Sequence, residues 1–471
     1  MDMSLRAALA GLNGLNGLPG TAGLPGADGS TTANALATTG ASVNVSNAAP
    51  PVVGQTPTAI TSIAAIWRNP LTLNALLFTS AGTDVQIIQA AVDKASELGI
   101  NAIVIPKKDV SNSAWSLDSA VLLPSNMTVY LQNCYLKLSD TCRDNFFRSN
   151  NIGYGITSFT TNTDIHIIGS GYALLEGASN PRSTGDNAKT LTTGAVGATQ
   201  SFGTDAGVSG QTQTGDWRNF SIYFGYVDRY SVQNITLKDM HAWGIVPERS
   251  SHGFIYNMTY NGNAYASGHT ASGTSYIVKN QNGVQANLGV TFLDILKTNC
   301  VYLTDDVIAL VPLGGTSPYA TAAGTYGGMV VTGNTIRSGT LDDTHDVTID
   351  NLCGYSTLNM VRLLDLNGLK IYNITINNVR DYKDTYAAPG TAIKIGTATA
   401  YGGSTYGNTH DVTITNVMTD ADNPIYVDGA LVRANISNIL KRSTVNANSC
   451  VYYTAAHLGH AAVMTSNLNP S

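Results

Sequence analysis

The sequence is poor in charged residues. Only 12% of its 471 residues are charged, whereas 47 are glycine, and an average soluble protein carries about 25% charged residues. This composition favours strands separated by many tight turns, in which glycine and asparagine supply the positive φ angles. Helices with charged surfaces can therefore occupy little of the chain.

Other absences exclude whole classes of function. The formal net charge is −6, and neither nucleic acid nor an anionic membrane is the expected partner, because both call for concentrated Lys and Arg. No stretch approaches the roughly 20 apolar residues of a membrane span, so we expect no membrane insertion. Residues 1–6 carry an early acid and lead into glycine-rich sequence, which does not resemble a secretion signal. We expect a protein that leaves its cell by lysis or within an assembled particle.

The cysteines are few and scattered. There are five of them, an odd number, and no close pair has the spacing that binds zinc. We expect free, buried thiols in a chain that folds in a reducing cytoplasm. The sequence implies neither a metal nor a cofactor.

The N-terminal region has a strict glycine pattern. A glycine occupies every third position from Gly11 to Gly29, and Pro19 and Pro25 each directly precede a glycine. Three polyproline-II chains need this pattern at their shared axis, because only glycine fits there. The pattern favours a homotrimer, and the alternative is a flexible glycine-rich linker. Residues 30–60 look like a linker, and we expect residues 1–60 to serve attachment and trimerisation.

Short strand-like segments repeat along the rest of the chain. The hexapeptide at 344–349 recurs identically at 409–414, an offset of 409 − 344 = 65, which we divide into three coils of about 22 residues. Related strands begin at Asn234, Asn257, Asn373 and Asn435, and the first step is 257 − 234 = 23. Each unit offers strand and turn sequence without a helix. The predicted fold is therefore all-β, a right-handed parallel β-helix, in which the recurrent asparagines form hydrogen-bonded ladders.

A solenoid needs a covered first coil, because an open end exposes core and strand edges. Apolar residues at helical spacing follow an N-cap candidate at Thr83-Asp84, Gly99 closes the segment, and the strand 102–106 comes directly afterwards. We predict a neck and capping helix within 61–110, a parallel β-helix over 111–440 and a C-terminal cap over 441–471.

Two polar motifs lie one coil apart. Asn280-Gln281-Asn282-Gly283 is followed by Thr304-Asp305-Asp306, which runs into the apolar strand 307–310, and 305 − 282 = 23. Together with the cap helix and the strands at 103–106 and 122–129, these motifs resemble the polygalacturonase family, glycoside hydrolase family 28, and the related pectinase-fold tailspikes of bacteriophages. The resemblance covers the chain from about Asp84 to Val379.

The motifs depart from the family pattern in three places. The aspartate of the first motif is Asn282, the histidine of a Gly-His-Gly motif is missing near 326–328, and the lysine of an Arg-Ile-Lys motif is Leu364, after Arg362. In the family, that Arg-Lys pair receives the carboxylate of galacturonate. A lone Arg362 makes a weaker clamp, so we expect a neutral or differently charged sugar instead of pectin.

The resemblance also implies catalytic roles. Neighbouring carboxylates raise each other's pKa, which can provide one acid and one base for glycoside hydrolysis. By resemblance, Asp305 is the general acid, and Asp306 activates the attacking water of an inverting reaction with help from Asn282. Asn282 can orient water but cannot act as a base. The alternative for the aspartates is an exposed turn, or a calcium or N-cap role. Trp243 and Tyr302 are candidate sugar-stacking residues.

Three hypotheses follow. The first is a trimeric phage tailspike, assembled in the host cytoplasm and attached to tail or baseplate proteins through its N-terminus, which binds and hydrolyses a host surface polysaccharide. The second is a glycan-binding or structural virion spike without turnover, and the discriminating feature is whether Asp342, Asp343 or Asp294 replaces the missing carboxylate. The third, a bacterial polygalacturonase-like enzyme, does not explain the glycine triplets.

Overall fold

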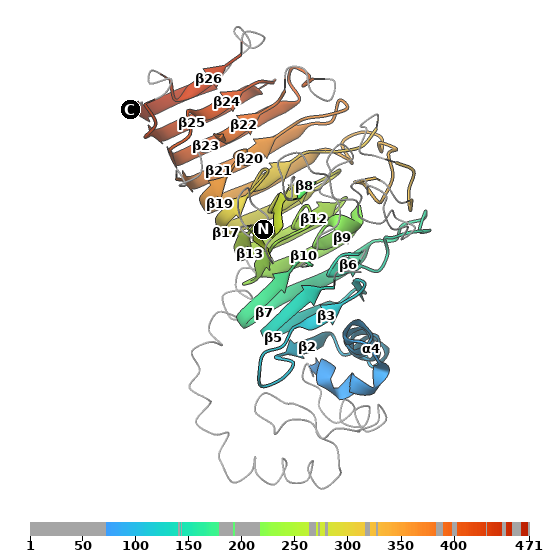
Figure 1. Ribbon diagram of the computed structural model, residues 1–471. Coiled ribbons are helices and arrows are strands. Elements are labelled where there is room, and N and C mark those ends of the chain that lie inside the picture. Colours follow the sequence, from blue (N-terminus) through green and yellow to red (C-terminus); the bar gives the residue numbers. More distant parts are fainter. Residues whose placement is uncertain are drawn as a thin grey trace, which may run out of the picture.

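The chain coils repeatedly in one direction, and successive coils add strands to two parallel sheets, as Figure 1 shows. The computed structural model describes residues 72–139, 142, 144–178, 192–193, 217–262, 270–271, 274–277, 281–315, 321–325, 328–382, 390–397, 403–429, 431–444, 449–454 and 463–469. These residues form the predicted right-handed parallel β-helix. The glycine triplets and residues 30–60 lie outside the described residues.

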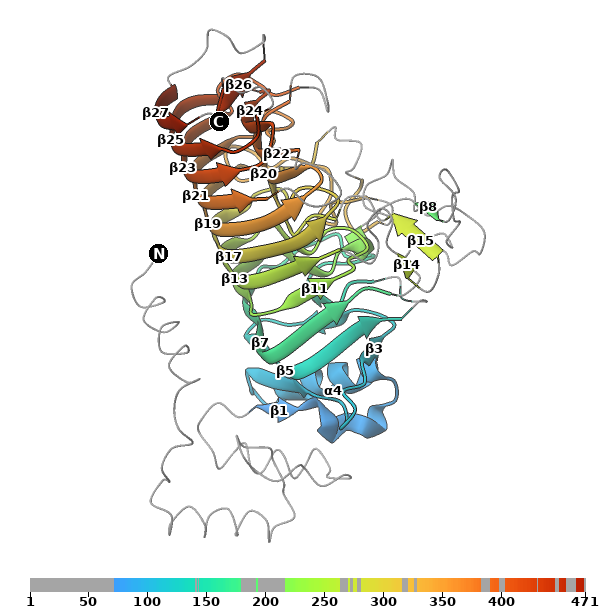
Figure 2. The ribbon, with the colours of Figure 1, turned by 60° about the vertical axis from the view of Figure 1, so that its left-hand side comes forward.

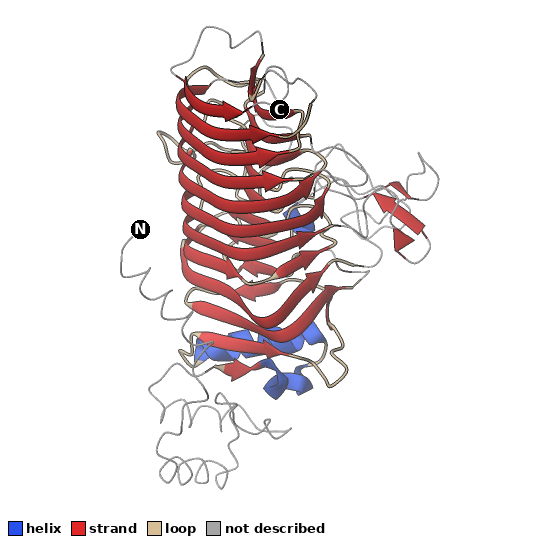
Figure 3. Ribbon diagram, turned by 90° about the vertical axis from the view of Figure 1, so that its left-hand side faces the viewer, coloured by secondary structure: helices blue, strands red, loops and turns tan. Residues whose placement is uncertain are grey.

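The larger sheet, here called sheet A, stacks 14 described strands along the solenoid axis (Figure 3). Its strands are β1 (Leu73–Asn74), β2 (Ala102–Pro106), β3 (Trp115–Leu117), β5 (Met127–Leu138), β7 (Asn162–Glu176), β10 (Val227–Gln233), β11 (Thr236–Lys238), β13 (Ser251–Asn261), β17 (Thr291–Leu303), β19 (Thr344–Ser356), β21 (Ile371–Asp381), β23 (Thr409–Thr419), β25 (Leu431–Lys441) and β27 (Val463–Asn469).

The second sheet, sheet B, consists of 10 shorter described strands. They are β4 (Val121–Leu123), β6 (Phe147–Ser149), β9 (Ile222–Gly225), β12 (Ile245–Glu248), β16 (Val284–Ala286), β18 (Ile308–Leu310), β20 (Asn359–Leu363), β22 (Thr391–Ile395), β24 (Asn423–Val427) and β26 (Val451–Tyr453). A small antiparallel sheet of β8 (Thr192–Thr193), β14 (Thr270–Ala271) and β15 (Thr274–Ile277) projects from the side of the solenoid (Figure 2).

The long strands of sheet A turn at two corners. In β21 the corners are Asn373 and Asn378, with φ of 54° and 53°, a left-handed conformation that asparagine tolerates better than most residues. Between the corners, alternate residues point inward, so Ile374 and Ile376 are buried. Each inward side chain stacks on its register partner in the next coil, as Ile374 does on Val412. This stacking forms one continuous apolar core along the axis.

The predicted asparagine ladder is confirmed for Asn234 and Asn257 but not for Asn373, whose Nδ2 donates to Oδ1 of Asp346 at 3.1 Å, or for Asn435, whose register partners are Thr413 and Met464. Nδ2 of Asn257 donates to Oδ1 of Asn234 at 2.8 Å. Further along the axis, Asn438 donates to Asn416 at 3.1 Å and Asn467 donates to Asn438 at 2.9 Å. These amides link neighbouring coils at one corner.

The division of the repeated hexapeptide into three coils is wrong. Thr344 pairs with Ile371, and Ile371 pairs with Thr409. The offset of 65 therefore comprises two coils, of 371 − 344 = 27 and 409 − 371 = 38 residues. Only the core-facing strands are constrained by stacking, and the loops between them accept different lengths.

The predicted capping helix is confirmed as α4 (Asp84–Glu97), preceded by the 3-10 helix η2 (Ala75–Ala81). The backbone N–H of Thr83 donates to Oε1 of Gln86 at 2.8 Å, and the apolar face of α4 packs into the core. Figures 1 and 2 show α4 covering the first coils. Within the described residues no single helix is long and apolar enough to cross a membrane, although η2 and α4, bent by 118°, reach that length and composition as a pair.

A second apolar cluster lies outside the solenoid core. The chain leaves the stack after β18 and returns at β19, and this excursion, residues 311–343, packs residues such as Leu313 and Val331 against Trp217, Phe220 and Trp243. None of the five cysteines forms a disulfide, and all except the half-buried Cys353 are buried as expected. Burial raises the pKa of Cys134 to about 12, so this thiol is unreactive.

Candidate active site

The two polar motifs meet on neighbouring coils. Val284 pairs with Ile308, which brings Asn282 beside Asp306, because 308 − 284 = 24 and 282 + 24 = 306. The backbone N–H of Gly283 donates to the carbonyl of Asp306 at 3.3 Å, and that of Val284 donates to the carbonyl of Val307 at 2.9 Å. Asn282 is thus one coil from the acidic pair.

The two aspartates differ in environment. Asp305 is half-buried, and its Oδ1 accepts a hydrogen bond from the backbone N–H of Asp306 at 2.9 Å. Asp306 is only 7% exposed, and its Oδ1 accepts from Nδ2 of Asn359 at 2.5 Å. The hydroxyl of Ser356 donates to the carbonyl of Asp305. Asp306 is therefore not part of a solvent-exposed turn, and the next coil fixes the position of both residues.

The order of coils differs from the order that the resemblance implied. Ala309 on β18 pairs directly with Arg362 on β20. The Gly-His-Gly motif was expected around 326–328, within the excursion. Tyr326 and Gly327 lie outside the described residues. The carbonyl of Gly328 accepts a hydrogen bond from the backbone N–H of Trp217. The amide of Asn359, instead of an imidazole, therefore contacts Asp306.

A lysine that sequence reasoning missed lies beside Arg362. Lys394 on β22 is the register partner of Arg362. Burial and the charge of Arg362 lower the pKa of Lys394, whereas the charges of Asp428 and Asp306 oppose this shift. A cation from the next coil thus lies beside Arg362, and Leu364 itself is buried in the second apolar cluster. The expectation of a lone arginine is wrong.

Two tyrosines extend this row of side chains. Lys394 pairs with Tyr426, and Tyr426 pairs with Tyr452, on β22, β24 and β26. Nζ of Lys394 lies 5.3 Å from the centroid of the Tyr426 ring. The rings of Tyr426 and Tyr452 are stacked, with centroids 5.2 Å apart, and Tyr452 is 44% exposed. Sheet B therefore presents cations and then aromatic rings on one line that leads away from the acidic pair.

The two aromatic residues predicted to stack on sugar are buried. Trp243 is 5% exposed and stacks on Phe220, with centroids 4.6 Å apart. Tyr302 is 4% exposed and packs against Tyr355. Neither ring offers a free face to a ligand in this arrangement. Sequence spacing put them near the acidic pair, but it did not reveal that the excursion covers one and the solenoid wall covers the other.

Asn282 begins a chain of amide hydrogen bonds across sheet B. It donates to Gln285 at 2.9 Å, Gln285 donates to Asn287 at 3.3 Å, and Asn287 donates to Oε2 of Glu248 at 3.2 Å. Among the described residues, no donor reaches Oδ1 of Asn282. This oxygen is buried and can accept a hydrogen bond from a water or a sugar hydroxyl.

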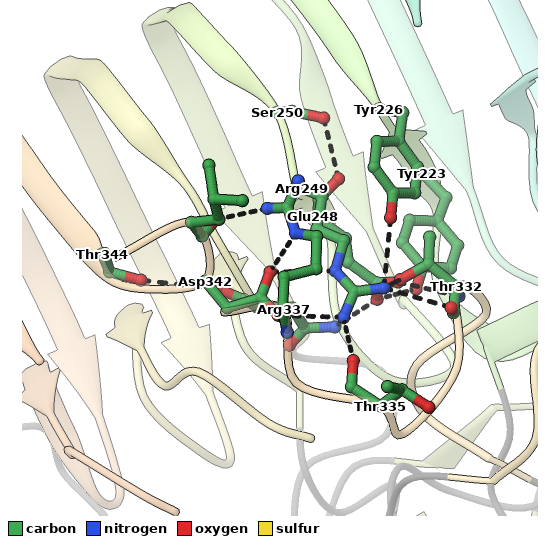
Figure 4. Close-up of polar contacts among 12 residues, drawn as sticks. Tyr223, Tyr226, Glu248, Arg249, Ser250, Thr332, Thr335, Arg337, Asp342 and Thr344 are labelled. Atoms are coloured by element: carbon green, nitrogen blue, oxygen red, sulfur yellow. Dashed lines mark hydrogen bonds and ion pairs between the residues drawn. The ribbon is translucent and has the colours of Figure 1, made fainter. Parts of the chain in front are cut away.

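Glu248 and Arg249 fasten the excursion to sheet B (Figure 4). Glu248 is fully buried and accepts hydrogen bonds from Thr332 and from the hydroxyl of Tyr223. Arg249 forms a bidentate ion pair with Asp342, 3.0 Å for each contact. Burial would raise the pKa of Asp342, but hydrogen bonds from Arg249 and from the backbone of Arg337 outweigh it and lower this pKa.

The three carboxylates considered as replacements are engaged or positioned elsewhere. Asp342 is paired with Arg249, and Asp343 accepts from the backbone N–H of Lys370 at 2.8 Å. Asp294 lies within β17 on sheet A. The additional carboxylate near the cations is Asp428. Within the described part of the chain, no group of three or more His, Cys, Asp or Glu is placed to hold a metal ion.

No family model matches this sequence, and no curated protein sequence matches it. Similar solved structures include a family 28 exopolygalacturonase of Yersinia enterocolitica, 14% identical over 85% of this chain and 78% of that chain, with a TM-score of 0.43. They also include the tailspike protein of E. coli bacteriophage HK620 in complex with a pentasaccharide, 14% identical over 82% of this chain, with a TM-score of 0.45. This chain spans 62% of that tailspike chain. Both groups that the sequence resembles are thus among the similar solved structures.

Proposed function

We propose that this protein binds and hydrolyses a bacterial surface polysaccharide at the acidic pair. The observation that carries the proposal is the register of sheet B, in which Asn282, Asp306, Arg362 and Lys394 belong to consecutive coils. A polysaccharide is itself a repeating chain, and a row of polar side chains and rings suits several of its units. The half-buried Asp305 donates a proton to the leaving oxygen, and Asp306 activates the attacking water of an inverting reaction.

The polysaccharide carries an acidic group. Arg362 and Lys394 place two like charges on neighbouring strands, and a carboxylate or phosphate bound between them would relieve their repulsion. Tyr426 and Tyr452 supply flat faces on which the next sugars stack. The sequence left open a neutral or a differently charged sugar, and this part of the proposal takes a charged one, because Lys394 lies beside Arg362.

The glycine triplets at 11–29 support a place for the protein in a phage tail, as a homotrimer held to tail or baseplate proteins through residues 1–60. A trimer would present three copies of the site to one surface, which raises the effective affinity for a repetitive polysaccharide. The mass of the full chain in solution tests this part, and a monomer would contradict it.

The activity is tested by incubating the full-length protein with a panel of bacterial capsular polysaccharides and O-polysaccharides and measuring new reducing ends. The Asp305→Asn and Asp306→Asn variants should each lose about 10²- to 10⁴-fold in rate. Asp294→Asn, a carboxylate on sheet A, is the matched control and should retain full activity. Proton NMR of the first product should show inversion of the anomeric configuration.

A second candidate is glycan binding without turnover. The observation that favours it is Asn282, which stands where the resemblance implies a carboxylate and which cannot take a proton from water. If the wild type binds a polysaccharide of the panel and releases no reducing ends on long incubation, this second candidate replaces the first.

A further inference from the structure

A groove lies on the outer face of sheet A, on a different sheet from the acidic pair. It has a volume of about 720 Å³ and crosses β5, β7, β10, β13 and β17, which is within the range of about 300–1,000 Å³ that small-molecule sites occupy. Residues that line it include Tyr130, Tyr172, Tyr256, Gln233, Thr236 and Lys297. Nothing in the proposed reaction uses these residues.

One wall of the groove is a bulge in β7. Ile168 pairs with Gln233 and Leu174 pairs with Thr236. Five residues of β7 therefore lie opposite two of the next coil, since 174 − 168 = 6 and 236 − 233 = 3. The three extra residues turn outward, and they lift Tyr172 to 51% exposure.

Two glycines make this bulge possible. A Cβ on Gly169 would lie 2.0 Å from the carbonyl oxygen of Asn234. Gly171 has a φ of +72°, and a Cβ there would lie 2.2 Å from Oδ1 of Asn133. That same oxygen accepts from the backbone N–H of Tyr172 at 3.1 Å. The bulge is thus tied to the preceding coil, and the wall of the groove is preformed.

The chemistry of the lining is that of a sugar site. Three tyrosines offer rings with polar edges, while amides and hydroxyls supply donors and acceptors. The Tyr256 ring stacks on Phe254, with centroids 5.6 Å apart, and Nζ of Lys297 lies 5.8 Å from its centroid. The lining formed by described residues contains no carboxylate and one cation. A nucleotide, with its clustered phosphates, would need more positive charge than this groove provides, whereas a single cation suits a sugar segment with few acidic groups.

We propose that this groove is a second, non-catalytic binding site for an oligosaccharide segment. Sugar rings stack on Tyr172 and on Tyr256, and their hydroxyls bond to Gln233 and Thr236. Because the groove and the acidic pair lie on different sheets, the groove holds a second stretch of polysaccharide, or a neighbouring chain, while the acidic pair acts on the first. This proposal does not require turnover at Asp305.

The probe is an array of bacterial capsular polysaccharides and O-polysaccharides. It is overlaid with full-length protein that carries Asp305→Asn and Lys394→Met, because these two changes weaken binding at the acidic pair. Tyr172→Ala and Tyr256→Ala should each reduce affinity for the bound polysaccharide about tenfold, which corresponds to the loss of one stacked ring. Tyr256→Phe should stay within about twofold, because it keeps the ring. Tyr154→Ala, an exposed tyrosine outside the groove (64% exposed), is the matched control.

Three results would overturn the proposal. One is that Tyr172→Ala and Tyr256→Ala bind the polysaccharide as tightly as the protein with an unaltered groove, while all three unfold at the same temperature. Another is a change of oligomeric mass in Tyr172→Ala, which would make the groove a contact between copies of the chain. The third is the absence of any bound polysaccharide on the array. If the protein with Asp305 and Lys394 intact releases no reducing ends while groove binding persists, that result would count against the proposed catalysis alone.

Discussion

Arg362 on β20 and Lys394 on β22 are register partners, so two cations lie next to each other on adjacent strands of sheet B. Like charges at this distance repel, and the nearby carboxylates Asp306 and Asp428 compensate only in part, because the pKa of Lys394 remains lowered by burial and by Arg362. An anionic group on a bound sugar would neutralise the remaining positive charge of the two side chains. In the proposed site, this pair therefore favours an acidic sugar.

Replacing Lys394 by methionine should weaken binding of an acidic oligosaccharide by about 10- to 100-fold, since one charge-assisted hydrogen bond contributes about 1.5–3 kcal/mol. Methionine keeps the length of the side chain and removes its charge. The dissociation constant should also depend less on salt than that of the wild type. Lys107→Met, at an exposed lysine near the cap, is the control. Equal affinities of the two variants would contradict the assignment.

Asn359 should act as a positioning residue through its hydrogen bond to Asp306. In Asn359→Leu this donor to Asp306 is lost, so kcat should fall about tenfold or more while KM changes little. Asn359→Gln keeps an amide and should recover part of kcat. A rise in KM with unchanged kcat would instead indicate a role in binding.

The fold was predictable because its main determinant is local. Short apolar strands, turn residues and an amphipathic segment before the first strand are all visible along the chain, and α4 follows the predicted pattern closely. The length of the coils was not predictable in the same way. The excursion 311–343 separates β18 from β19, and no pattern in the strands indicates how long such a loop is.

The unpredictable length of the coils also explains which site residues were missed. Asn282 and Asp306 are joined by a coil of near-average length, so their spacing predicts their proximity. Lys394 lies 32 residues after Arg362, and only the register of the sheet shows that the two residues lie side by side on neighbouring strands. A signal did exist, because Lys394 is a single polar residue between Ile393 and Ile395, which marks an outward position on a short strand.

The stability of the C-terminal half should depend on the protonation of Asp381. This carboxylate is fully buried, and burial raises its pKa to about 6, against the hydrogen bonds from Thr419 and the backbone of Asp420. Because the folded pKa is raised, the native state binds the proton more tightly than the unfolded state. The stabilisation is complete below about pH 4 and is lost as the pH rises through 6, by up to about 3 kcal/mol.

The variant Asp381→Asn removes this titration. It should resemble the wild type near pH 4 and exceed it in unfolding free energy at pH 7, as measured by urea denaturation. Asp411→Asn is the opposite control, because hydrogen bonds from Arg433 and His410 lower the pKa of Asp411. That variant should be less stable than the wild type above about pH 4, and the difference should shrink as the pH falls below 4. Parallel pH profiles for Asp381→Asn and the wild type would contradict the prediction.

The buried ion pair of Arg249 and Asp342 should hold the excursion in place. The two side chains are 3% and 0% exposed. Asp342→Asn would leave an uncompensated buried guanidinium, which costs about 3–5 kcal/mol. Arg337 contacts the same carboxylate from a side chain that is 31% exposed, so Arg337→Ala should cost about 1 kcal/mol or less. Limited proteolysis should cut within 311–343 in Asp342→Asn well before it does so in Arg337→Ala. Equal rates of cleavage would show that Glu248 and its contacts to Thr332 are enough to anchor the excursion.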